Sequence, residues 1–449
     1  MAELDHANDG DLSVSRRPSP SNQRVLLGLA VALWTAMVGL TRAWGMHLEA
    51  TGTRLILFTP PVVGGYREVV SPRLWIVAGA GALLAWGLPW VAERVSWAAL
   101  LAVTTAGAAV WWLALGSVDG WDGLTRGLYW EADYADAVEV VAGAPGRFLR
   151  DYVATLPEQP IALRGHPPGF ALLFGFLEWI GLTGDGWAAA VVVATGLSAV
   201  AAVLVTMRCV AGEPVARRAA PFVALTPAAT WIVTSTDAVT MATGAWLVAL
   251  LALAGTTYPA RRRPADLYAV AAGVLAAFTV LQSYGAVLLT LPVAAIAWHQ
   301  RRWRPMIVAA LVAVGIVVTL AGWGFWWFEG LFATMHEYQS LGVERPYEFA
   351  LFANLGAWAL ALGPATAAGL AALRHRPTWV VVGGGLSAAL VADLSGLSEL
   401  EVERIWLPFT LLVLPAAGCL WASRRVITGW LMTQVVSAVA FTAVIGANW

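Results

Sequence analysis

The sequence predicts an all-α polytopic membrane protein with about 13 transmembrane helices. Of its 449 residues, 59% are apolar and 12% are charged, and the mean hydropathy is +0.70. A soluble domain carries roughly 25% charged residues. Apolar runs of about 17–25 residues, long enough to cross a bilayer, recur along the chain. The net charge of −1 gives no sign of nucleic-acid binding, so the lipid bilayer is the partner that composition predicts.

The chain divides into four regions by polarity. Residues 1–24 are polar, and we expect a disordered cytoplasmic tail. The run 25–44 is longer than a signal-sequence core and has no small-residue cleavage site after it, which favours a retained first span. Three spans make up an N-terminal segment (25–116), an external loop follows (117–185), and the remaining spans form a bundle (186–449). The predicted spans are 25–44, 74–92, 97–116, 186–210, 219–236, 237–255, 267–283, 284–299, 306–328, 349–372, 378–394, 405–422 and 426–446.

Arginine clusters predict the orientation, because basic residues favour the cytoplasmic face. The clusters are Arg16/Arg17, Arg217/Arg218, Arg261/Arg262/Arg263, Arg301/Arg302/Arg304, Arg374/Arg376 and Arg424/Arg425. All of them lie inside only if the short apolar piece 167–182, which contains Glu178, does not cross. We therefore expect 167–182 to be a juxtamembrane or re-entrant helix, with the N-terminus inside and the C-terminus outside.

The acidic segment 130–142 of the external loop predicts a short amphipathic helix, which Gly143 and Pro145 end. Asp133 and Asp136 lie together on its polar face. The apolar face consists of Trp130, Tyr134, Ala137, Val138 and Val141. One interpretation is an interfacial helix with its acids in water. The other is that neighbouring carboxylates and burial raise the pKa of one acid, foremost Asp133, which then removes a proton from an acceptor hydroxyl.

The external loop closes on Arg164-Gly165-His166-Pro167-Pro168-Gly169, the most specific local motif. Two prolines favour a rigid entry into the next helix, because proline is tolerated in a first helical turn. Arg164 and His166 would then be held at the bilayer surface, where a lipid phosphate would lie. The alternative is a helix-start turn with solvated basic side chains.

Later external segments add further candidates. Asp237 stands where two spans meet, and it either caps the following helix or binds sugar or acceptor hydroxyls. Arg404, at the outer end of a span, is either anchored by Glu403 or binds a phosphate with its planar fork. Tyr338 lies in the loop 329–348, where we expect a polar cap over the cavity. With Asp136 and Asp237, both Glu403 and Tyr338 are candidates for binding sugar or acceptor.

Three of these features together resemble the C-type (GT-C) membrane glycosyltransferases. They are the acidic and aromatic cluster in a long external loop, the His-Pro-Pro-Gly that ends it, and an Asp in a later external hairpin. The stretch Glu403-Arg404-Ile405-Trp406-Leu407-Pro408-Phe409 is similar to one found in uncharacterised actinobacterial members, and the resemblance covers roughly 117–422. It implies external juxtamembrane helices in the first catalytic loop, a polyprenyl-phosphate sugar donor, an inverting displacement, and chemistry on the outer face of the cell membrane.

Residue by residue, the resemblance gives Asp133 or Glu131 the place of the catalytic acid, Asp237 that of the second external acid, and His166 the His-Pro-Pro position. The expected function is transfer of a pentose or hexose, such as arabinose or mannose, from polyprenyl phosphate to a cell-envelope glycan or lipid acceptor. Asp133 would be the general base, and the leaving phosphate would meet the external cations Arg164, His166 and Arg404.

We expect no metal and no cofactor, because no metal-ligand spacing and no nucleotide-binding glycine loop occur. The two cysteines, Cys209 and Cys419, lie near predicted cytoplasmic span ends and do not indicate a disulfide framework. The alternative function is that of a transporter or a lipid-linked-sugar flippase. Such a protein should carry ionisable residues in the centres of several spans, and here the span centres are almost free of them.

Overall fold

The computed structural model describes residues 20–69, 71–129, 135–340, 344–398, 401–420 and 422–446. Within these ranges the chain is almost entirely helical, and ten helices are long and apolar enough to cross a membrane. The prediction of an all-α polytopic membrane protein is confirmed. The ten are α1 (Pro20–Ala50), α2 (Pro72–Arg94), α3 (Trp97–Gly116), α9 (Asp185–Ala211), α12 (Asp237–Thr257), α13 (Arg262–Val280), α15 (Arg304–Gly322), α17 (Tyr347–Ala372), α18 (Arg376–Leu394) and α21 (Arg424–Val444).

Interrupted helices occupy the other three predicted spans. They are α10 (Glu213–Ala224) with α11 (Ala229–Ile232), η3 (Tyr284–Leu289) with α14 (Thr290–Gln300), and α19 (Val402–Ile405) with α20 (Leu407–Val413) and η4 (Leu414–Leu420). Proline accounts for two of the breaks, because it removes a backbone donor and clashes with the preceding turn. Pro227 follows α10, and Pro415 lies in η4.

Side chains satisfy the backbone groups that a break leaves open. Beyond α10, the indole Nε1 atoms of Trp112 and Trp111 donate to Ala224 O and Thr226 O, each at 3.1 Å. Backbone polar groups at membrane depth must find partners inside the protein. These two buried tryptophans therefore make the interrupted segment compatible with a position in the bilayer.

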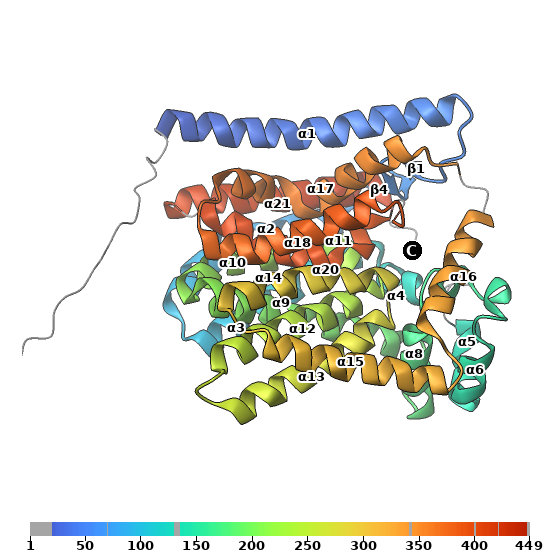
Figure 1. The fold of residues 1–449 in the computed structure, drawn as a ribbon. Coiled ribbons are helices and arrows are strands. Elements are labelled where there is room, and N and C mark those ends of the chain that lie inside the picture. Colours follow the sequence, from blue (N-terminus) through green and yellow to red (C-terminus); the bar gives the residue numbers. More distant parts are fainter. Residues whose placement is uncertain are drawn as a thin grey trace, which may run out of the picture.

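The packing of the bundle is centred on α12, because 83% of its apolar 18-residue stretch is buried. The corresponding values for α1 and α15 are 6% and 11%. Figure 1 accordingly shows α1 along one edge of the bundle and α13 and α15 along another. Because α1 and α15 are apolar but have few protein neighbours, their exposed faces are suited to lipid. Any site lined by α12 is enclosed by other helices.

Two short antiparallel strand pairs lie at one end of the bundle. In the first, β1 (Phe58–Thr59) pairs with β2 (Val62–Val63), and in the second, β3 (Gly65–Tyr66) pairs with β4 (Ile445–Gly446). β3 comes after α1 and β4 directly after α21. The C-terminal ends of α1 and α21 are therefore held at the same end of the bundle.

The same end carries the short helices of residues 117–185, the segment predicted to be an external loop. Figure 1 shows α4, α5, α6, α8 and α16 gathered there, away from the helix turns that contain the arginine clusters. α8 has 11 residues, or about 16 Å, which is shorter than a hydrocarbon core of roughly 30 Å, and the prediction that 167–182 does not cross the bilayer stays a prediction. The elements are η1 (Ser117–Asp119), α4 (Asp122–Tyr129), α5 (Ala135–Gly143), α6 (Pro145–Asp151), η2 (Leu156–Glu158), α7 (Ile161–Arg164), α8 (Gly169–Trp179) and, from a later loop, α16 (Trp327–Ser340).

Candidate functional site

A network of charged side chains joins the start of α12 to α19. Arg404 donates from Nη1 to Asp237 Oδ2 at 2.8 Å and from Nη2 to Glu401 Oε2 at 2.5 Å. The side chain of Asp237 is 2% exposed, that of Arg404 18% and that of Glu401 35%. Glu401 is thus the solvent-facing member of the network, and Asp237 is the enclosed one.

The partners of Asp237 differ from those of a helix cap. α12 begins at Asp237 itself, with Thr236 as the preceding residue. Besides Arg404, the carboxylate accepts a hydrogen bond from Ser235 Oγ at 2.7 Å, and the Asp237 N–H donates to Ser235 Oγ at 3.0 Å. The carboxylate is therefore oriented toward Arg404, which lies 167 residues further along the chain.

Glu403, the neighbour that the sequence suggested as an anchor for Arg404, faces another element. Its side chain is wholly buried, and its Oε1 accepts a long hydrogen bond of 3.4 Å from the N–H of Val63 in β2. Glu403 therefore does not anchor Arg404, and its contact with β2 does not support the predicted contact with a sugar.

The His-Pro-Pro-Gly corner is docked onto the turn that follows α13. His166 Nδ1 lies 3.0 Å from Gln282 O, so Nδ1 carries the proton and the neutral ring has its lone pair on Nε2. Burial lowers the pKa of His166, while the nearby charge of Asp237 opposes this shift and that of Arg404 adds to it. His166 thus belongs electrostatically to the Asp237–Arg404 network.

Two further contacts hold this corner in place. Gly169 N donates to Leu281 O at 2.7 Å, and a Cβ at position 169 would lie only 2.2 Å from that oxygen. The hydroxyl of Tyr152 lies within hydrogen-bond distance of His166 O (2.6 Å) and Leu163 O (2.9 Å). The final glycine of the motif is thus required by close backbone approach, a reason that the sequence alone does not reveal.

Buried polar groups without a partner lie beside the network. Gln282 is wholly buried, and its Oε1 accepts from Thr243 Oγ1 at 3.4 Å. Within the described chain, neither Gln282 Nε2 nor the hydroxyl of Thr240, one helical turn after Asp237, has a hydrogen-bond partner. Buried polar atoms are normally paired, so these two are candidates for binding a polar ligand or water. In the sequence, Gln282 lies at the end of the predicted span 267–283, and nothing there assigns it a role.

Arg164 and Tyr338 meet α16 at the rim of this region. Arg164 Nη1 lies 3.7 Å from Glu337 Oε2, and Tyr338 OH accepts a hydrogen bond from Arg345. Arg345 also donates from Nε to Leu55 O at 3.1 Å. α16 therefore contacts Arg164, and the cap expected for the loop 329–348 stays a prediction.

The acidic helix can be placed only in part. Glu131 and Asp133, the two candidates for the base, lie outside the described residues. Asp136 belongs to α5, but its side chain is not among those described. Val138 and Val141 are buried, and α5 packs against α8, as the predicted apolar face requires. Since α8 begins at Gly169, three residues after His166, this packing connects α5 to the His-Pro-Pro-Gly corner.

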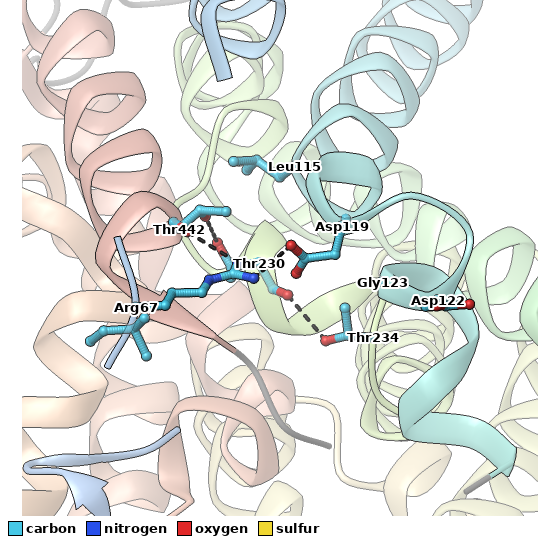
Figure 2. A pocket seen from close by; sticks show the side chains of 10 residues that line it. Arg67, Leu115, Asp119, Asp122, Gly123, Thr230, Thr234 and Thr442 are labelled. Atoms are coloured by element: carbon cyan, nitrogen blue, oxygen red, sulfur yellow. Dashed lines mark hydrogen bonds and ion pairs between the residues drawn. The ribbon is translucent and has the colours of Figure 1, made fainter. Parts of the chain in front are cut away.

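A small polar cavity lies at the joint between α3, α11 and β4 (Figure 2). Arg67 Nη1 is 2.6 Å from Asp119 Oδ1, and Arg67 Nη2 donates to Thr442 O at 3.1 Å. The hydroxyls of Thr230 and Thr442 are 3.3 Å apart. The cavity measures about 20 Å³, enough for one ordered water. We interpret this cavity as a structural joint where the segments that contain Arg67, Asp119, Thr230 and Thr442 meet.

An apolar groove runs along α16 near the corner. It has a volume of about 510 Å³ and is lined by Val153, Trp326, Phe328, Glu329, Phe332 and Ala333. Val153 follows Tyr152, whose ring packs edge to face on Phe325 with centroids 5.4 Å apart. The groove is therefore adjacent to the side chain that holds His166 in place.

Comparison with known proteins gives no match to a protein family model, a curated protein or a solved structure. The function must therefore be argued from the motifs and from the geometry of this end of the bundle.

Proposed function

We propose that this chain is a GT-C-like glycosyltransferase that moves a pentose or hexose from a polyprenyl-phosphate donor to a cell-envelope glycan or lipid. The observation that carries the proposal is the docking of the His-Pro-Pro-Gly corner beside the enclosed Asp237–Arg404–Glu401 network. Cations, carboxylates and unpaired polar groups are thus brought together at one end of a membrane bundle. A purely structural scaffold has no need of such a cluster.

The proposal includes 13 membrane crossings, with the three interrupted segments crossing as bent helices. Arg217, in α10, donates to Ala92 O (2.8 Å) in the last turn of α2, whereas α11 leads into Asp237 at the other end. Similarly, Gln300 at the end of α14 donates to Ala252 O (3.1 Å) near the end of α12. The β3–β4 pairing supports an odd number of crossings, because α1 and α21 finish at the same end. With the arginine clusters in the cytoplasm, the candidate site lies on the external face of the cell membrane.

The donor phosphate would be bound by Arg164, His166 and Arg404. Arg164 is held by a loose 3.7 Å pair with Glu337 and can turn toward an anion. Arg404 already shares its fork between Asp237 and Glu401, so a phosphate would replace Glu401, the more exposed partner. Bidentate binding of a phosphate is the geometry for which a guanidinium is suited. The polyprenyl chain would lie in the apolar groove along α16.

The acceptor and the sugar would meet the polar groups beyond the phosphate. Asp136, Asp237 and Tyr338 remain the candidates for binding the sugar and acceptor hydroxyls. In the transfer step, Asp133, or Glu131 in its place, removes the proton from the acceptor hydroxyl. The acceptor oxygen then bonds to the anomeric carbon with inversion, and the electrons of the broken carbon–oxygen bond pass to the phosphate.

The test uses purified protein with a polyprenyl-phosphate pentose or hexose and measures the release of polyprenyl phosphate with acceptor present. We expect Asp133→Asn, which is nearly isosteric, to lower the transfer rate about 10²–10⁴-fold while donor binding is kept. Asp136→Asn is the matched control and should have a milder effect. Loss of activity in Glu131→Gln with an active Asp133→Asn would move the base to Glu131. Full activity in both would remove the main support for a glycosyltransferase.

A further inference from the structure

The turn after α12 and the turn between α14 and α15 meet at the opposite end of the bundle from the candidate site. Their meeting point is the ring of Tyr258. The guanidinium carbons of Arg262, Arg302 and Arg304 lie 5.8, 6.0 and 6.0 Å from the centre of this ring. Two arginine clusters about 40 residues apart in the sequence thus share one aromatic side chain, and a cation over an aromatic face is attracted by it.

Most of the charge in these two turns is uncompensated. Asp266 is the single acid in the stretches 257–266 and 297–306, and Arg304 binds it with Nε at 3.2 Å and Nη2 at 2.9 Å. Arg261, Arg263 and Arg301, which neighbour these arginines in the sequence, are also exposed. The surface around Tyr258, which we call the Tyr258 patch, therefore attracts anions and has only one carboxylate of its own.

The surroundings of the Tyr258 patch suit a lipid. Trp298 and Trp303 flank the arginines, are exposed, and pack edge to face with centroids 6.2 Å apart. α15, which begins beside the patch, is apolar and has little protein cover. Exposed tryptophans are typical of the level where headgroups meet acyl chains. A ligand at the patch therefore has cationic partners for a headgroup and an apolar helix for its chains.

We propose that the Tyr258 patch is a binding site for the headgroup phosphate of an anionic phospholipid. The paired guanidinium groups would bind the phosphate oxygens, and Tyr258 would hold these groups at a common position beforehand. A bound phosphate would also relieve the repulsion among the arginines. The inference does not depend on sugar transfer, since the patch lies at the other end of the bundle.

The experiment measures lipid binding to the delipidated full-length protein in detergent by native mass spectrometry. Phosphatidylglycerol is the anionic lipid, and phosphatidylcholine is the zwitterionic reference. Arg262→Gln/Arg302→Gln removes two charges from the patch. Arg424→Gln/Arg425→Gln removes two exposed charges at the start of α21, across the bundle, and is the matched control. All four positions are at helix ends or turns outside the core, and the melting temperature without lipid checks folding.

We expect the Arg262→Gln/Arg302→Gln variant to bind phosphatidylglycerol at least tenfold more weakly, and the Arg424→Gln/Arg425→Gln variant to change by less than about threefold. Tyr258→Phe should bind like the unaltered protein and Tyr258→Leu more weakly, because only leucine removes the aromatic face. Equal losses in the two arginine doubles would overturn the site and leave general charge attraction. Equal affinity for phosphatidylcholine, or full competition by soluble glycerol phosphate, would overturn the assignment to an anionic lipid.

Discussion

Removal of Arg404 tests whether the Asp237–Arg404–Glu401 network is an enclosed and coupled unit. Arg404→Ala leaves Asp237, which is 2% exposed, without its cation. Loss of one partner from a buried ion pair destabilises a protein by about 3–5 kcal/mol. Since Arg404 is itself 18% exposed and water can partly replace it, we expect the lower figure, about 3 kcal/mol. For a chain of this size, such a loss corresponds to a fall in melting temperature on the order of 5 °C.

The assay is the melting temperature of the purified protein in detergent, measured for a double-mutant cycle. Asp237→Ala in the Arg404→Ala background should recover part of the loss, because it removes the unpaired buried carboxylate, with a coupling energy of about 0.5–3 kcal/mol. The melting temperature of Arg404→Lys should lie between those of the unaltered protein and Arg404→Ala. Lysine keeps the charge but cannot bind both carboxylates as a guanidinium does. Arg147→Ala is the control, because Arg147 forms a surface ion pair with Asp151 in which the two side chains are 77% and 55% exposed. Its loss should change the melting temperature little. An unchanged melting temperature in Arg404→Ala, or additive losses in the cycle, would refute the coupled network.

Two further predictions concern the corner and the topology. Gly169→Ala should destabilise the protein and lower transfer, because its Cβ would clash with Leu281 O, whereas Gly165→Ala, with no atom nearer than 3.8 Å, should be tolerated in the same two assays. For the topology, single cysteines are introduced at Gly120, Ser340, Arg262 or Arg302 and treated with an impermeant thiol reagent in intact cells. We expect labelling at Gly120 and Ser340, on the external face, and protection at Arg262 and Arg302. Labelling at position 262 or 302 would contradict the assigned orientation.

The sequence by itself determined the class of the protein and the end of the bundle to examine. Long apolar runs predict helices because a backbone in hydrocarbon must pair its own polar groups. The apolar face that contains Val138 and Val141 was likewise predicted from helical spacing, and both side chains are buried. These properties are local, so periodicity and composition are sufficient to find them.

The tertiary structure alone decided which polar groups meet. Arg404 pairs with Asp237 across 167 residues, and His166 meets Gln282 across 116. Glu403, the sequence neighbour of Arg404, turns instead to Val63. Such pairings depend on how helices far apart in the chain pack and on where three of the expected spans break. No spacing along the chain carries that information, because the contacts arise only when buried charges find partners in the folded bundle.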